Sequence, residues 1–587
     1  MDKMEVGLCL TNKCTNADAE AMIDFAGRYV GKGNATLHSI TASCTELDRV
    51  APDAGSVVAC VLLSILILLV LIATAIHPGK EAQEAQTPME HAVKAEDVAS
   101  GLTNALLPVS QHPQEEEGQA AAFGTATVKV LRQSKFVMAF SLITNFEKMM
   151  GSPQEMKTDS LNGMRVISML WIILGHTFLM PEAIAGYSNP EDVVGSFGAV
   201  QGWWFQIIVG AEIGVDTFFF LSGFLLCYLT MKDLHKLKIS GAIIYRYLRL
   251  TPSLVFAMMF YYKISMFIGD GPFFARFQNS VFRRCDKSWW TEPLYIFNFY
   301  PTSSDDLCMG WTWYLGDDFI FFIITLPLML LAGSNKRHGW IALVVICVSS
   351  TVVTGFLVLH YDLGVYVFNS QYTQYSFYAY SKPYTRIPAY LIGVGAAWLA
   401  LDYDLASVSS VLSCYTSGER IRMHIANLVA MVLLVVIVVC PLGNFQDPAS
   451  WGKLENLLFI CFARIVWSCS LSVLTFSCMV GMLPQINRLL SLRMFVPLAR
   501  LTYGAYLWHP IIIKWSAGVS TSYYYFDTQS LLARLALNSL LAFSCSAIQF
   551  LLVERPMLSL TILMIKGKKK EAPKEEPPPP AVARNGA

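Results

Sequence analysis

A succession of apolar runs, each near 20 residues long, most restricts the fold of this chain. An α-helix needs about 20 apolar residues to cross the hydrocarbon core of a bilayer, and lipid-exposed backbone must pair its polar groups within the segment. We therefore expect an all-α fold, a polytopic membrane helical bundle. The sequence has eleven such runs, at 56–76, 161–180, 203–230, 245–268, 312–333, 340–360, 386–402, 423–442, 456–483, 495–516 and 531–553.

Composition supports a membrane protein and excludes some other classes. Hydrophobic residues make up 54% of the chain and charged residues 15%, where soluble domains have about 25% charged residues. The formal net charge is zero, so nothing indicates a nucleic-acid partner. The 14 cysteines are scattered without zinc-site spacing, and we expect no bound metal.

The polar segment 1–55 is typical of a non-cytosolic compartment. It contains Cys9, Cys14 and Cys44 and a glycosylation sequon that begins at Asn34. The odd number of cysteines suggests that a partner lies in upstream sequence. We interpret 1–55 as an extracellular or lumenal segment, with a cytosolic tail carrying free thiols as the alternative.

The remaining chain divides by composition. After a first transmembrane helix at 56–76, residues 77–154 form a predicted cytosolic linker with an amphipathic helix at 136–150. Residues 155–560 form the membrane domain. A basic and proline-rich tail occupies 561–587.

Basic residues predict the orientation, because Lys and Arg concentrate in cytoplasmic loops. Alternating spans bring Lys232, Arg246, Arg420, Arg488 and Lys568 to one side, and the intervening loops 181–202 and 517–530 contain no Lys or Arg. We expect the N-terminus outside or in the lumen and the C-terminus in the cytosol, at the plasma membrane or endoplasmic reticulum.

The long loop 269–311 falls on the non-cytosolic side in this scheme, although it carries several basic residues. It also contains Cys285 and Cys308. Two cysteines in one loop that faces an oxidising compartment favour a disulfide over two free thiols.

The run from Leu161 to Met180 contains two ionisable groups, Arg165 and His176. They lie eleven residues apart, which on a helix is about 16 Å of rise and roughly 20° from alignment, so they share a face. The structural alternative is an arginine that snorkels and a histidine that bonds a neighbouring helix. Charged groups inside a membrane are costly and usually functional.

Two further runs carry polar groups. Glu212 and Asp216 lie one helical turn apart, and Asp216 is expected to pair with Arg165 or with an imidazole, or to hold helices together. Tyr506 and His509 lie in the tenth run. His176, Asp216 and His509 have similar predicted depths, which favours a shared cavity.

Several ordered motifs make the chain resemble a known family. They are LNGMRVISMLWIILGHTF, GVDTFFFLSGFLL, YRYLRLTP, WTWYLGDDF, YSKPYTRIPAYLIGV and LTYGAYLWHP. With these motifs the chain resembles the acyltransferase type-3 superfamily over about 155–560, and within it the nose-resistant-to-fluoxetine group. GLCLTNKC is similar to the end of that group's cysteine-rich domain, most of which is lacking here.

The resemblance implies a membrane acyltransferase that uses acyl-CoA as co-substrate and an acceptor hydroxyl or amine. Four motifs of the family have counterparts in this chain. They contain, in order, Arg165 and His176; Asp216 and the Phe-Phe that follows it; Arg246 and Arg249; and Tyr506 and His509. In this reading His176 is the general base, Asp216 orients it, and His509 binds the acceptor. Arg165 binds the phosphates of CoA, and Arg246 and Arg249 extend that anion site. Glu212 and Tyr506 are further candidates for substrate binding.

Acyl transfer needs these residue types. A base takes the acceptor's proton, and a donor stabilises the tetrahedral oxyanion. An acyl-serine route is less attractive because Ser222-Gly223 lacks the Gly-x-Ser-x-Gly elbow. The alternative function is a transporter or binding protein for lipids or hydrophobic xenobiotics, and a receptor that reads ligands through its outer segment is a third.

Overall fold

The computed structural model describes residues 53–77, 134–151, 158–301, 303, 306–402 and 417–566, and these residues are helical apart from their connections. Two compact units form. Of the described residues, the larger unit contains those of 53–64, 150–239 and 254–548, and the smaller contains those of 65–149, 240–253 and 549–566. The all-α prediction is therefore confirmed for the described residues. Cys9, Cys14, Cys44, Asn34 and the part of the predicted tail after residue 566 lie outside them.

Eight helical segments of the described chain are long and apolar enough to cross a bilayer. Three other expected spans form helices of 20 to 24 residues but carry more polar side chains: α7 (Ser160–Leu179), α17 (Pro383–Asp402) and α22 (Phe495–Gly518). Each is largely buried by protein, so it does not need an apolar surface throughout. The count of eleven spans stays a prediction. The eight segments are Ala54–Ala75, Ala211–Lys236, Ile239–Phe267, Gly310–Ser334, Lys336–Tyr361, Gly418–Gln446, Lys453–Met479 and Thr528–Met564.

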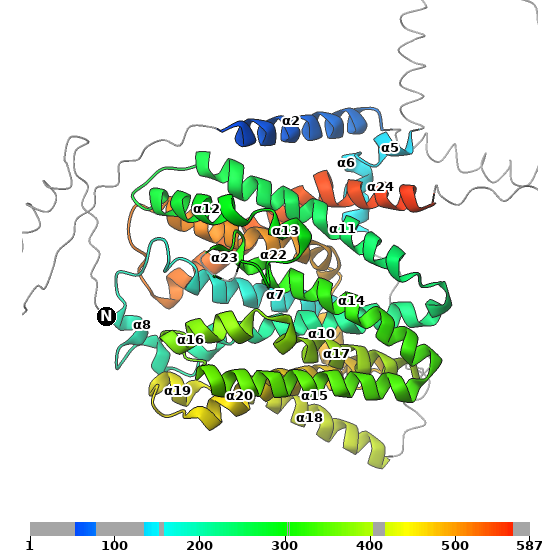
Figure 1. Ribbon diagram of the computed structural model, residues 1–587, viewed down its shortest axis with the longest axis vertical. Helices are drawn as coiled ribbons and strands as arrows, with labels where there is room; N and C mark the ends of the chain where they lie inside the picture. Colours follow the sequence, from blue (N-terminus) through cyan, green and yellow to red (C-terminus); the bar gives the residue numbers. More distant parts are fainter. Residues whose placement is uncertain are drawn as a thin grey trace, which may run out of the picture. The chain divides into compact units, whose positions relative to one another are not determined.

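Helix α10 (Ala211–Thr230) lies at the centre of the larger unit and packs against α7 and α17 (Figure 1). Glycines allow the close approach of α10 and α17. A Cβ at Gly223 would lie 2.2 Å from the Tyr390 carbonyl oxygen, and one at Gly393 would lie 2.2 Å from that of Phe220. Small residues at helix crossings let backbones touch in membrane bundles. Here they hold α17 against α10, the helix that carries Glu212 and Asp216 and is called the acidic helix below.

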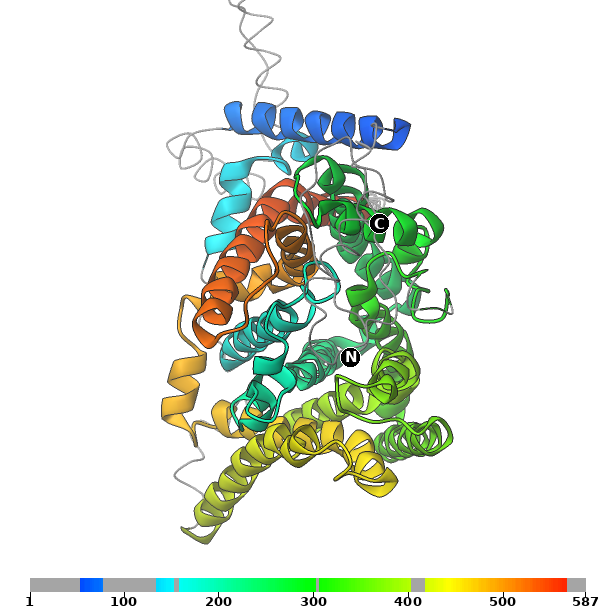
Figure 2. The same cartoon turned by 90° about the vertical axis from the view of Figure 1, so that its left-hand side faces the viewer.

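An outer layer of apolar helices covers this centre. Helix α15 (Lys336–Tyr361) packs against α14 (Trp313–Ser334), α17 and α20 (Lys453–Met479), and α18 (Ser417–Val439) packs against α20. Figure 2 shows α18, in yellow, lying along α20 at the edge of the unit. Valines of α15 and α18 remain exposed on the outer surface, Val352 at 65% and Val435 at 63%. An apolar exposed face of this kind suits contact with lipid.

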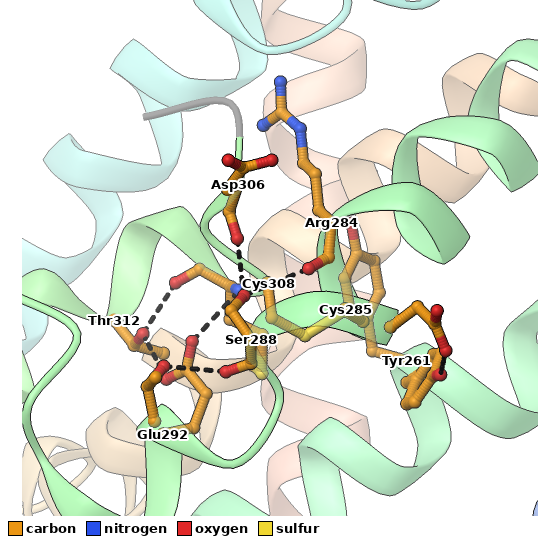
Figure 3. The surroundings of a disulfide bond; sticks show 12 residues. Tyr261, Arg284, Cys285, Ser288, Glu292, Asp306, Cys308 and Thr312 are labelled. Carbon is orange, nitrogen blue, oxygen red and sulfur yellow. Dashed lines mark hydrogen bonds between the residues drawn. A yellow bond between two sulfur atoms is a disulfide. The ribbon is translucent and has the colours of Figure 1, made fainter. Parts of the chain in front are cut away.

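The long loop between the fourth and fifth expected spans is ordered by helix α12 (Phe274–Ser288) and helix α13 (Thr291–Leu294). A disulfide joins Cys285 of α12 to Cys308, so the structure contains the predicted bond (Figure 3). Glu292 is buried beside it and accepts hydrogen bonds from Met309 N at 3.1 Å and Thr312 Oγ1 at 2.7 Å. The described residues around this disulfide are therefore packed together, with Cys285, Glu292 and Cys308 all buried.

The smaller unit contains the predicted amphipathic helix as two pieces, α5 (Lys135–Met138) and α6 (Leu142–Met150). The helix is interrupted between them. Asn145 Nδ2 donates hydrogen bonds to the Ala139 carbonyl at 3.0 Å and to the Leu551 carbonyl at 3.3 Å. The sequence expectation of one continuous helix at 136–150 is thus corrected, because a buried side-chain amide binds the backbone at the break.

Candidate active site

Helix α7 carries the first candidate residues and lies deep in the larger unit. Most of its residues are buried, and Gly175 meets α10 so closely that a Cβ there would lie 2.7 Å from that of Ala211. Any larger residue at 175 would push the helices apart. The next residue, His176, is only partly buried, so α7 presents an imidazole beside a tightly packed helix crossing.

The structure brings His176 and His509 together. His176 Nδ1 lies 2.7 Å from His509 Nε2, and the two rings are within 10° of parallel. The ring centroids are 5.0 Å apart, so the rings meet edge to edge through this nitrogen pair. Two histidines 333 positions apart in the chain thus form one hydrogen-bonded unit.

The hydrogen-bond partners determine the tautomers of this unit. His509 Nδ1 lies 2.9 Å from the Ala505 carbonyl oxygen, which can only accept, so Nδ1 carries the proton. In neutral His509 the other nitrogen, Nε2, is then an acceptor. His176 must donate from Nδ1, and its Nε2 keeps a free lone pair. A partner that fixes one nitrogen in this way also fixes the role of the other.

Tyr506 and Lys514 extend the site along α22. Tyr506 Oη donates to the Trp311 carbonyl at 2.6 Å, and Lys514 Nζ lies 4.7 Å from the centre of the Trp311 ring. Lys514 is also close enough to His176 to interact electrostatically. Sequence reasoning missed Lys514, although a lysine within an apolar run was a signal of function.

Asp216 and Glu212 form a second polar group. Asp216 Oδ2 lies 2.7 Å from Arg386 Nη1 and 3.9 Å from Arg464 Nε, while Arg386 Nη2 lies 3.8 Å from Glu212 Oε1. Tyr375 Oη donates to Glu212 Oε1 at 2.5 Å and accepts from Arg464 Nη2 at 2.7 Å. Two carboxylates and two guanidinium groups therefore balance one another.

This arrangement revises the expected partners of Asp216. Its carboxylate binds the guanidinium of Arg386, where the sequence suggested Arg165 or an imidazole. The position beside His176 Nδ1 is taken by His509. The sequence analysis did not single out Arg386 and Arg464. Each is a charged residue within an apolar run, which was a signal of function, and a guanidinium is a suitable partner for a buried carboxylate. The orienting role of Asp216 and the substrate-binding role of Glu212 stay predictions.

The three arginines expected to bind CoA phosphates belong to different units. Arg165 belongs to α7 in the larger unit, while Arg246 and Arg249 belong to the segment 240–253 of the smaller one. Their joint role in binding CoA phosphates stays a prediction. Among the described residues, no group of three or more His, Cys, Asp or Glu side chains could hold a metal ion.

Comparisons with known proteins place this geometry in a family. The type-3 acyltransferase domain model matches residues 158–553. The chain is 27% identical to "Nose resistant to fluoxetine protein 6" of Caenorhabditis elegans over 96% of this chain and 67% of that protein. It is 24% identical to "Regulator of hypoxia-inducible factor 1" of the same organism over 79% of this chain and 92% of that protein.

No solved structure matches the chain. The family match covers more than half of the sequence and includes both histidines of the pair, the two acidic residues of α10 and both of their arginine partners. The chain therefore belongs to the type-3 acyltransferase family.

Proposed function

We propose that this protein is a membrane-bound acyltransferase that moves an acyl group from acyl-CoA to a hydroxyl or amine of a lipid, glycan or other small acceptor. The observation that carries the proposal is the hydrogen-bonded chain from His176 through His509 to the Ala505 carbonyl. It leaves His176 Nε2 unprotonated and oriented, which is what a general base requires.

In the proposed reaction, His176 Nε2 takes the proton of the acceptor as its oxygen or nitrogen attacks the thioester carbonyl. The tetrahedral intermediate then collapses, the C–S bond breaks, and the proton on His176 passes to the departing CoA sulfur. The products are the acylated acceptor and free CoA, and the imidazole is regenerated. While His176 is protonated, its Nδ1–H bond to His509 becomes charge-assisted and stronger.

Cationic side chains are suited to the two anionic parts of this reaction. Lys514 lies five residues after His509 on α22 and beside the Trp311 ring, where positive charge would favour an oxyanion that develops on the thioester carbonyl. Arg165 lies on α7 three turns before His176, and its planar guanidinium matches the phosphate groups of CoA. The substrates are assigned from this chemistry and from the family.

The experiment uses purified full-length protein in lipid nanodiscs, radiolabelled acyl-CoA and a total lipid extract. The wild type is expected to produce a labelled acceptor, and His176→Ala should lower the rate by about 10²–10⁴-fold. His424→Ala is the matched control, because His424 is exposed on α18.

The same preparations are then placed in sealed liposomes to follow lipid movement. Transfer of label that requires His176 supports the enzyme. If wild-type protein makes no acyl-CoA-dependent product while lipid still crosses the bilayer, the enzyme proposal fails and the transporter alternative replaces it.

A further inference from the structure

A cavity in the larger unit lies beside the acidic helix and away from the histidine pair. Its volume is about 50 Å³, and it is bordered by residues of α9 (Phe205–Val209), α10, α16 (Ser370–Tyr375), α17, α18 and α20. Neither His176 nor His509 lines it. A space of this size accepts a small polar group with a few carbon atoms, or several water molecules.

One polar side chain at this cavity has unused hydrogen-bonding capacity. Gln206 of α9 is fully buried and lines the cavity, and neither its amide nitrogen nor its amide oxygen has a hydrogen-bond partner in the described part of the chain. A buried polar group without a partner destabilises the protein, because it has lost its hydrogen bonds to water. The amide therefore favours a ligand that can both donate and accept a hydrogen bond.

The charges around the cavity select a neutral ligand. Glu212, Arg386 and Arg464 also line it, and with Asp216 they contribute two negative and two positive formal charges. Arg464 Nη1 has no partner and adds a donor. An anionic or cationic ligand would unbalance these buried charges at a high desolvation cost. A hydroxyl group satisfies the donors and acceptors and leaves the balance intact.

The remaining walls are apolar and continue toward the lipid-facing surface. Phe445 and Phe459 border the cavity with Ile437 and Val438 of α18. The residue before Ile437, Val436, is 50% exposed on the outer apolar face of that helix. A hydrocarbon chain attached to the bound hydroxyl could therefore leave the cavity along α18 without crossing a polar surface.

We propose that this cavity is a binding site for a neutral, hydroxyl-bearing lipid of the monoacylglycerol type, with the hydroxyl held by Gln206 and Arg464 and the chain directed along α18. The site is separate from the proposed catalytic histidines. Its occupancy is measured by binding, so it does not depend on the enzyme assignment.

The probe is a monoacylglycerol that carries a diazirine and an alkyne in its acyl chain, used on full-length protein in nanodiscs. Irradiation should label peptides that contain Phe445 or Phe459, and excess unlabelled monoacylglycerol should compete. Gln206→Leu should weaken labelling about tenfold, the effect of one hydrogen bond of about 1.4 kcal/mol. Gln446→Leu is the control, since Gln446 is exposed and donates to the Gln201 carbonyl.

A second variant removes the space rather than the polar contact. Ala463 lines the cavity, and Ala463→Phe should abolish labelling while the protein still elutes as the wild type. Labelling that is not competed, or that survives both variants, overturns the proposal in favour of a cavity that holds water only. Equal or stronger labelling by the matching fatty acid overturns the choice of a neutral ligand.

Discussion

The histidine pair and the charged group are two polar clusters that differ in what they leave free. In the charged group, Asp216 and Glu212 are balanced by Arg386 and Arg464, so its strongest interactions are internal. In the histidine pair, the Ala505 carbonyl and the His509 imidazole fix His176, whose Nε2 has no hydrogen-bond partner among the described residues. The charged group neutralises its own charges, although Arg464 Nη1 keeps a free donor, whereas the histidine pair keeps a basic nitrogen available for the proposed reaction.

The comparison assigns different costs to mutation. Removing one member of a buried ion pair leaves an uncompensated charge and destabilises the fold. Removing a general base lowers the rate and leaves most packing intact. Effects on stability and on activity should therefore separate between the two clusters.

The largest expected effect on stability is in the charged group. Arg386→Met leaves Asp216 buried without its 2.7 Å partner and should lower the free energy of unfolding by about 3–5 kcal/mol. Lys336→Met is the matched control, because its pair with Asp402 is largely exposed and should contribute less than about 1 kcal/mol. Denaturation in detergent measures both. If Arg386→Met has the same free energy of unfolding as Lys336→Met, the charged group does not stabilise the fold as argued here.

A second prediction separates pH effects on stability from those on catalysis. Burial raises the pKa of Glu292 from 4.5 to about 7, against its hydrogen bonds with Thr312 and Met309, which lower it. Below pH 4.5 both folded and unfolded states are protonated. Between pH 4.5 and 7 the unfolded chain loses this proton first, so stability falls as pH rises and then levels off, by on the order of 3 kcal/mol.

Glu292→Gln should flatten this pH dependence, because the amide does not titrate and still accepts a hydrogen bond. Thermal unfolding of both proteins from pH 4 to 8 is the measurement. An unchanged slope in the variant would show that other groups cause it. The glutamine variant then allows the pH profile of acyl transfer to be measured without the contribution of Glu292 to stability.

A smaller effect is expected on substrate binding. Arg165→Ala should raise KM for acyl-CoA about 10–100-fold through loss of charged hydrogen bonds of about 1.5–3 kcal/mol, and Arg165→Lys should recover only part of it because an ammonium cannot bind two oxygens side by side. The exposed Arg493 provides the control variant Arg493→Ala. If KM is unchanged in both Arg165 variants, Arg165 does not bind the donor.

Sequence reasoning predicted the elements better than their pairing. Apolar periodicity and length indicate the helices, and one oxidising loop with two cysteines indicates the bond between Cys285 and Cys308. Similar depth also suggested a cavity shared by His176, Asp216 and His509. The two histidines lie 2.7 Å apart, whereas Asp216 pairs with Arg386. The partners of Asp216 were not predicted, because several spans carry an ionisable residue at similar depth and only packing decides which helices meet.

The remaining differences have similar causes. The break at 139–141 depends on Asn145 binding the backbone, a contact without a sequence pattern. Gln206 was not singled out, because an isolated glutamine in an apolar run gives no indication of whether its amide will be satisfied. Its importance follows from the cavity alone.

A double-mutant cycle on acyl transfer tests the central claim most directly. His176→Ala, His509→Ala and the double variant are compared with wild type by transfer of label from acyl-CoA. If His509 acts only by orienting His176, the double variant should be as slow as His176→Ala, about 10²–10⁴-fold below wild type, with no further loss. Losses that multiply in the double variant, or a His176→Ala protein with wild-type activity, would contradict a base held by its histidine neighbour.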